Sequence, residues 1–316
     1  MKAQRFDITH TTTYDYRAPV TVAHHLLRLA PRRLPRQFQL AHSLGITPAA
    51  AVTHHIDYFG NEVVFAGIEG AHRQLCVSAR SQVAVAPAFI PDPAETPAWE
   101  VVRNLCLADL SEPVLDASEF TFASPLVPLE PAFRTYAAES FPAGRPILEG
   151  VLELSARIHR EFEFDATATT VSTPLAQVLE RRQGVCQDFA HFMIACLRSL
   201  GLPARYVSGY LETVPPPGQA KLLGADASHA WVAFFCPGIG WTDVDPTNNL
   251  LPSMQHITLG WGRDYGDVSP IRGFLVGGDE HTLTVAVDVV ATGEVEFHGG
   301  DSPGTALLAY GAHRDT

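Results

Sequence analysis

Alternating apolar and polar positions run through the first 90 residues, a pattern typical of half-buried β-strands. The predicted strands are residues 6–14, which are rich in β-forming residues, and residues 52–58, 62–68 and 75–85, with a turn predicted at residues 59–61. Prolines then cluster between residues 86 and 99, which indicates a linker or a domain boundary. We therefore expect a β-rich N-terminal domain over residues 1–95, and a linker with short helices over residues 96–148.

The second half of the chain changes to the spacing of amphipathic helices. Helices are predicted at residues 131–140, 147–163 and 186–200, and a shorter one where Thr173 would cap a helix that starts at Pro174. Strands are predicted at residues 205–212, 230–236, 241–245 and 282–290. This succession predicts an α+β fold, with a core of helices and antiparallel strands over residues 149–290. The polar segment 291–316 would be a tail and is a candidate for disorder.

Composition places the chain among ordinary globular proteins and excludes some partners. The 316 residues carry a net charge of −12, which argues against a nucleic-acid partner. A cluster of arginines is the local exception, which we interpret as a solvated edge or loop, with a phosphate or acidic-peptide site as the alternative. Its members are Arg28, Arg32, Arg33 and Arg36. No apolar stretch is long enough for a membrane span or a signal peptide, so we expect no membrane association.

The five cysteines point to a reducing compartment. Their number is odd and no two form a CxxC pair, which predicts free thiols and a cytoplasmic location. Four of them fit the pattern of small buried hydrophobic residues. These are Cys76, Cys106, Cys196 and Cys236. The fifth, Cys186, follows a glycine turn and starts the clearest predicted helix.

The position of Cys186 makes it the candidate nucleophile. The free N–H groups and partial positive charge of a helix N-terminus favour a thiolate over a thiol. His229 and Asp245 follow along the chain, at the start of one predicted strand and the end of the next. A cysteine, a histidine and an acid are the groups that covalent acyl transfer requires.

Whether His229 and Asp245 meet depends on the hairpin between their strands, which the sequence leaves open. A turn centred on Pro237 would set His229 opposite Asp245, whereas a turn centred on Ile239 would set it opposite Asn249. If the first register holds, Asp245 could fix the imidazole tautomer and leave the other ring nitrogen for Cys186.

Three nearby residues could take over one of these roles. His191 is turned away from Cys186 around the helix, so we expect it to pack or cap locally. Asp243 shares a strand face with Asp245 and could replace it, although Asp245 ends the strand, where a site can open. Asp188 lies in the first turn of the helix, where a stabilising helix-start acid and a catalytic acid are equally open interpretations.

Three sequence blocks resemble the bacterial transglutaminase-like superfamily. They are residues 184–191 (GVCQDFAH), 228–232 (SHAWV) and 240–248 (GWTDVDPTN), and residues 262–268 (GRDYGDV) look like a further block. Residues 11–16 and 27–31 look like the β-rich N-terminal domain that accompanies this core in bacteria. The resemblance implies a papain-like core and a Cys-His-Asp triad, carried here by Cys186, His229 and Asp245. The family mixes cross-linking enzymes with peptidases and amidases.

These observations predict a cysteine-dependent hydrolase that acts on a peptide or amide substrate through a thioester. The alternatives are an acyltransferase, in which an amine intercepts the thioester, and a binding module without activity. The sequence has no calcium-binding run, and its paired histidines (His24-His25 and His54-His55) would point to opposite faces of a strand. We therefore expect no metal and no cofactor.

Overall fold

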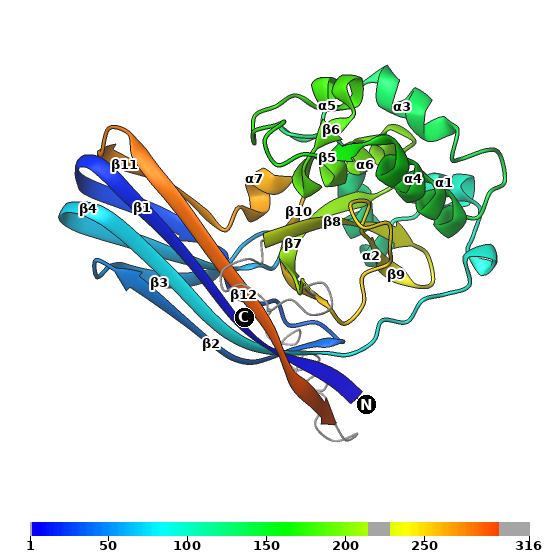
Figure 1. Ribbon diagram of the computed structural model, residues 1–316. Coiled ribbons are helices and arrows are strands. Elements are labelled where there is room, and N and C mark those ends of the chain that lie inside the picture. The colour runs from blue at the N-terminus through cyan, green and yellow to red at the C-terminus, as the bar shows by residue number, and fades with distance from the viewer. Residues whose placement is uncertain (1, 214–227, 297–316) are drawn as a thin grey trace, which may run out of the picture.

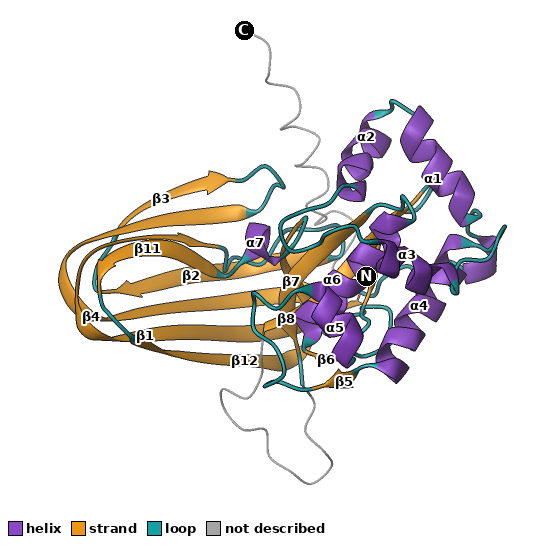
Figure 2. Cartoon of the chain, turned by 90° about the horizontal axis from the view of Figure 1, so that it is seen from above, coloured by secondary structure: helices purple, strands orange, loops and turns teal. Residues whose placement is uncertain are grey.

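The computed structural model describes residues 2–213 and 228–296. Residues 214–227 and most of the predicted tail, from residue 297 on, lie outside this part of the chain. Within the described residues, the structure contains no helix with the length and hydropathy that a membrane span requires. Long strands lie at one end of the molecule and the helices gather at the other (Figure 2).

The N-terminal region forms a six-stranded sheet, as the alternating pattern predicts. Its central pair is β1 (Lys2–Leu27) and β4 (Glu62–Val85), which run antiparallel along nearly their whole length. Strands β2 (Gln37–Thr47) and β3 (Ala51–Ile56) pair with β4. The predicted turn at residues 59–61 connects β3 to β4, where Gly60 has a positive φ of 76°.

The last strands of the chain correct one expectation. We expected the strands up to residue 290 to belong to the catalytic core. Instead β11 (Ile271–Gly277) and β12 (His281–Glu296) both pair with β1 (Figure 1). Alternation in a sequence reports that a segment is a strand but not which sheet it joins. The large sheet is therefore built from both ends of the described chain, while the exact domain boundaries stay a prediction.

Along the chain, most of the helices lie between the first four strands of the N-terminal sheet and the strands of the second sheet. The short helices of the linker region are η1 (Pro93–Glu95), α1 (Trp99–Ala108), α2 (Glu112–Ser118), η2 (Glu119–Thr121) and α3 (Pro131–Ala138). They are followed by α4 (Ile147–Glu161), α5 (Leu175–Arg181) and α6 (Cys186–Ser199), with the short parallel strands β5 (Glu163–Phe164) and β6 (Gln183–Gly184) between them.

The start of α5 differs by one residue from the expectation. Pro174, not Thr173, is the cap residue, and the first helical residue is Leu175. The Thr173 hydroxyl instead accepts a hydrogen bond from the backbone N–H of Thr170 at 2.9 Å. The side chain is therefore used by the preceding turn and not by the helix.

A second, four-stranded antiparallel sheet lies against α6, in the order β10-β7-β8-β9 (Figure 1). Its strands are β7 (Ala204–Leu211), β8 (Ser228–Cys236), β9 (Gly240–Val244) and β10 (His256–Gly262). Alternate residues of β8 face opposite ways. Val232 and Phe234 share a buried cluster with the apolar side chains of α6, whereas Trp231 and Ala233 form a cluster on the other face.

Amide side chains from the N-terminal region hold the outer edge of β10. The Gln37 side chain donates to the Thr258 carbonyl at 2.8 Å and accepts from the Thr258 N–H at 2.7 Å. Asn61 makes the same pair of bonds with the backbone of Trp261, at 2.9 and 3.0 Å. These contacts satisfy backbone groups that an edge strand would otherwise leave unpaired. They join the N-terminal sheet to the sheet that carries the candidate site.

Candidate active site

A buried clamp fixes the start of α6, where Cys186 is the first helical residue. The Asp188 carboxylate accepts from the Val185 N–H at 2.8 Å and from the Thr169 hydroxyl at 2.6 Å. A Cβ atom at Gly184 would lie only 2.8 Å from the same carboxylate oxygen, so only glycine fits beside it. Burial raises the pKa of Asp188, and the two hydrogen bonds act in the opposite direction. Of the two interpretations of Asp188, the contacts therefore favour the helix-start acid.

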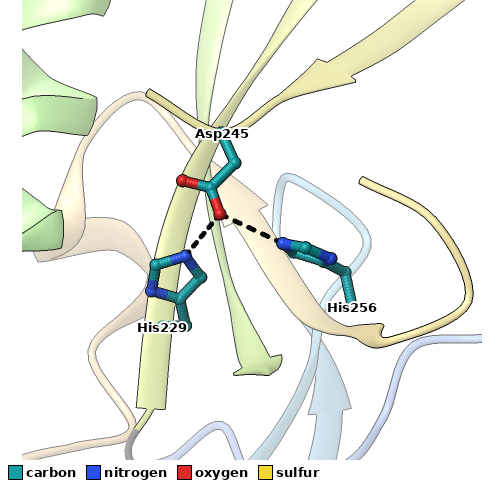
Figure 3. Close-up of side chains that lie close together, drawn as sticks. All are labelled: His229, Asp245 and His256. Atoms are coloured by element: carbon teal, nitrogen blue, oxygen red, sulfur yellow. Dashed lines mark hydrogen bonds and ion pairs between the residues drawn. The ribbon is translucent and has the colours of Figure 1, made fainter. Parts of the chain in front are cut away.

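His229 and Asp245 lie in direct contact, as Figure 3 shows. The His229 Nε2 and Asp245 Oδ2 atoms are 2.8 Å apart, and Asp245 is completely buried. The side chain of Asn248 donates to the same oxygen at 2.7 Å. The other carboxylate oxygen accepts from the backbone N–H groups of Thr247 and Asn248, at 2.9 and 3.2 Å. The carboxylate is thus held at both ends in one orientation.

Cys186 contributes to the electrostatic environment of the His229 imidazole and helps to raise its pKa. Because Nε2 faces Asp245, Nδ1 is the ring nitrogen left for the thiol. Burial lowers the pKa of His229, but the interactions with Asp245 and Cys186 outweigh it and raise the pKa to about 9. Burial likewise raises the pKa of Asp245, and its bonds from His229 and His256 hold it well below the usual range. The structure thus favours a protonated imidazole beside an ionised carboxylate.

The observed hairpin follows neither register expected from the sequence. Val232 pairs with Val244 and Cys236 with Gly240, so the turn centres on Gly238. Extending this register sets Trp231 opposite Asp245 and makes His229 its diagonal neighbour on the same face. Both Gly238 and Gly240 have positive φ values, which allow the tight connection. The side chain of Asp245 therefore reaches His229 across the diagonal rather than from directly opposite.

His191 and Asp243 make their contacts away from the pair formed by His229 and Asp245. His191 accepts a hydrogen bond from the Tyr265 N–H at 3.0 Å, and burial lowers its pKa to about 4, in agreement with local packing. Asp243 forms an ion pair with Arg36 at 3.4 Å. Asp243 therefore binds Arg36, whereas Asp245 binds His229.

The sequence did not predict that a second histidine, His256, contacts Asp245. His256, the first residue of β10, places its Nε2 atom 3.1 Å from Asp245 Oδ2 (Figure 3). Its ring is buried and packs edge-on against Trp231 at 5.2 Å. Strand β10 is two strands away from β8 in the sheet, so neither spacing nor hairpin geometry could have brought His256 to the site. Asn248 was within a recognised block, but no role had been assigned to it.

The same side chains raise the question of a metal ion. One ligand atom each from His229, Asp245 and His256 lies within 4.8 Å of the others, a group that could hold a metal. In the structure both histidine Nε2 atoms instead sit at hydrogen-bonding distance from one carboxylate oxygen. A metal at this position would have to displace both bonds, because it needs the nitrogen lone pairs that the N–H groups occupy. The expectation of no metal stays a prediction.

A cysteine at the start of a helix, packed against an antiparallel sheet that carries a histidine and an aspartate, defines the class of papain-like and transglutaminase-like folds. Comparison with known families agrees with this class. Residues 6–84 match the bacterial transglutaminase-like N-terminal region, and residues 134–246 match the transglutaminase-like superfamily. The chain therefore belongs to the transglutaminase-like superfamily, which confirms the resemblance drawn from the sequence blocks.

Individual relatives extend over most of the chain. An uncharacterised protein of Mycobacterium tuberculosis is 40% identical over 296 residues, which cover 90% of this chain and 92% of that protein. A proposed cysteine protease from Cytophaga hutchinsonii has the same fold, with a TM-score of 0.71, 22% identity and 94% coverage of both chains. A protein-glutamine gamma-glutamyltransferase of Pseudomonas aeruginosa is 33% identical over 107 residues, 31% of this chain and 16% of that enzyme.

Proposed function

We propose that this protein is a cysteine hydrolase that cleaves an amide or peptide bond through a thioester. Cys186 is the nucleophile, His229 the proton carrier and Asp245 the residue that orients the imidazole. The observation that carries the proposal is the 2.8 Å contact between His229 and the buried Asp245, which leaves the Nδ1 atom of the imidazole for Cys186. This is the relation among nucleophile, base and orienting acid that covalent acyl transfer requires.

In the first half-reaction the Cys186 thiolate attacks the carbonyl carbon, and the carbonyl oxygen becomes an oxyanion. The backbone N–H of Cys186, at the first residue of α6, would help to bind this negative charge. The C–N bond then breaks, His229 gives its proton to the leaving nitrogen, and the amine departs. The acyl group remains on sulfur as a thioester.

In the second half-reaction His229, now neutral, takes a proton from water while the water oxygen attacks the thioester carbon. The C–S bond breaks, the acid is released, and Cys186 and His229 return to their starting protonation states. Asp245 keeps its charge throughout, because His229 and His256 donate to it and hold its pKa well below the usual range.

Acyl transfer to an amine is the second candidate. It shares the thioester, and part of this chain, 107 residues, is 33% identical to the Pseudomonas glutamyltransferase. The two reactions differ only in the group that attacks the thioester. We favour hydrolysis because water is present at a concentration that amines cannot match.

The test offers glutamine-containing peptides and peptide amides with and without a labelled primary amine. The hydrolase proposal expects acid product, with amine incorporation the minor outcome even at millimolar amine. More amide product than acid would replace it with the transferase. Mass spectrometry should find the acyl adduct on Cys186, and Cys186→Ser should abolish it, whereas Cys106→Ser should not. Neither product nor adduct across the panel would favour the binding module. The cytoplasmic location stays a prediction, which fractionation of the native host tests.

A further inference from the structure

The face of the four-stranded sheet that turns away from α6 carries a buried arginine, Arg205. Arg205 on β7 is 8% exposed, and its guanidinium makes no hydrogen bond or ion pair to any described residue. It lies over the ring of Trp241 at 4.1 Å and over the ring of Trp261 at 3.7 Å. Stacking occupies the faces of a guanidinium but leaves the N–H groups along its edge unused.

A cavity of about 500 Å³ opens beside this arginine. It lies between the linker after β4, the β8–β9 hairpin and β10, and Arg205 and Arg36 both line it. Most of the remaining wall is apolar. The apolar lining includes Phe89, Ile90, Ile239, Trp241, Leu251 and Trp261. A concave apolar site with a few fixed polar groups is the usual form of a small-molecule pocket, and this volume is in the usual range.

One member of the arginine cluster found in the sequence, Arg36, also lines this cavity. Only Arg33 in the cluster is exposed, so the other three residues do not form the solvated edge that we expected. Arg32 is packed 3.4 Å from the centre of the Trp261 ring, and Arg28 pairs with Asp57 at 3.3 Å. Arg36 reaches the cavity and pairs with Asp243 there at 3.4 Å. The cluster thus adds a second arginine to the wall of the cavity, and Asp243 balances its charge.

We propose that this cavity binds a small carboxylate with an apolar body, held by the edge of the Arg205 guanidinium. A planar carboxylate matches the fork of an arginine in a bidentate pair. The apolar walls would take the body of the ligand. Asp243 in the same wall would repel a phosphate dianion more strongly than a single carboxylate, so the proposal favours the monoanion.

Electrostatics support binding of an anion. Burial lowers the pKa of Arg205 to about 9, with Asp243 raising it and Arg32 lowering it further, so the group stays charged at neutral pH. A buried charge without a hydrogen-bonded counterion is unfavourable, and an incoming carboxylate would offset that cost.

The cavity is separate from the proposed reacting groups. Neither Cys186 nor His229 lines it. On β7, Arg205 pairs with Ala233 and Gly209 pairs with His229, so the two positions are four residues apart. At the rise of an extended strand this is about 13 Å. The proposal therefore does not depend on the proposed hydrolysis, and the two can fail independently.

Binding of 4-phenylbutyrate to the Cys186→Ser protein tests the proposal without any acyl chemistry. Tryptophan fluorescence should respond, because Trp241 and Trp261 line the cavity, and calorimetry gives the affinity. The neutral isostere 4-phenylbutyramide should bind roughly tenfold more weakly, the effect of losing one charge-assisted hydrogen-bonded pair. Equal binding of the amide, or no saturable binding of the acid, would overturn the proposal.

Variants locate the site. Arg205→Met should weaken phenylbutyrate roughly tenfold or more. Arg33→Met makes the same change on an exposed arginine that is not part of the cavity wall, and should leave binding unchanged. Wild-type affinity in a folded Arg205→Met protein would contradict the assignment. If Arg205→Met does not fold, Ile90→Ala decides, because Ile90 is half exposed at the cavity: weaker binding supports the site and unchanged binding opposes it.

Discussion

Replacing Asp245 by asparagine should damage both the activity and the fold, because five N–H groups converge on this carboxylate. Oδ2 accepts from His229, His256 and the Asn248 side chain, and Oδ1 accepts from the backbone of Thr247 and Asn248. An asparagine has one oxygen and one NH₂ group. In either orientation, the NH₂ group therefore replaces an oxygen that accepts at least two N–H groups in the wild-type protein, and those donors lose their acceptor.

The contacts set the expected magnitudes. Two buried donors without an acceptor cost about 2–6 kcal/mol of unfolding free energy, at about 1–3 kcal/mol each. The pKa of His229 should fall from about 9 toward or below its usual 6.5, since the bond to Asp245 no longer offsets burial. A shift of this size is worth about 3 kcal/mol, or roughly a hundredfold in the ratio of imidazolium to neutral imidazole. If NH₂ instead faces His229, Nε2 must accept, and Nδ1 then carries the proton and cannot act as the base.

The assay combines urea unfolding with turnover of the best amide substrate, measured where both proteins are folded. Asp245→Asn should lose roughly a hundredfold or more in turnover and several kcal/mol of stability. Asp243→Asn is the matched control and should cost less, because its ion pair with Arg36 is partly exposed and such pairs contribute about 1 kcal/mol or less. The reasoning is refuted if Asp245→Asn unfolds at the wild-type urea concentration, or if Asp243→Asn has the larger effect on turnover.

Three further outcomes follow from the same contacts. Cys186 should be alkylated at neutral pH far faster than Cys196, since burial raises the pKa of the latter thiol; peptide mapping after iodoacetamide would show equal rates if this is wrong. Because the pKa of His229 is raised, its stabilising contribution is complete below about pH 6.5 and is lost as the pH rises through about 9. Across that pH window, the free energy of unfolding of the wild type, measured in urea, should fall by about 3 kcal/mol relative to that of His229→Gln. Parallel pH dependence of the two unfolding free energies would contradict the assignment. Gly184→Ala should cost about 1–3 kcal/mol and reduce turnover, since the new Cβ meets the Asp188 carboxylate at 2.8 Å; an unchanged melting temperature would refute the clamp.

Much of the fold follows from periodicity. The apolar stripe of α6, the alternation of the N-terminal strands and the turn glycines each predicted an element that the structure contains. The pairing of β11 and β12 with β1 could not be predicted in this way, because it joins segments from opposite ends of the chain. Alternation sets which face of a strand is buried, whereas the choice of partner depends on packing between distant segments.

The same limit applies to the candidate site. Cys186, His229 and Asp245 were identifiable because residue types in that order, at a helix start and on neighbouring strands, match a known chemistry. His256 was not, since its contact with Asp245 depends on where β10 lies in the sheet. Arg205 was not either: nothing in an alternating strand segment distinguishes an arginine stacked on two tryptophans from one that points into solvent.

The position of β10 gives the N-terminal sheet a role in the candidate site. His256 begins this strand and donates to Asp245, while two residues further on Thr258 is bound at both its N–H and its carbonyl by Gln37. Asn61 repeats that contact at Trp261, whose ring packs against Arg205. The amide side chains of the N-terminal region thus fix the strand that supports both the orienting acid and the proposed carboxylate pocket. The N-terminal region is in this sense part of the site itself, because the geometry around Asp245 depends on a strand that it holds in place.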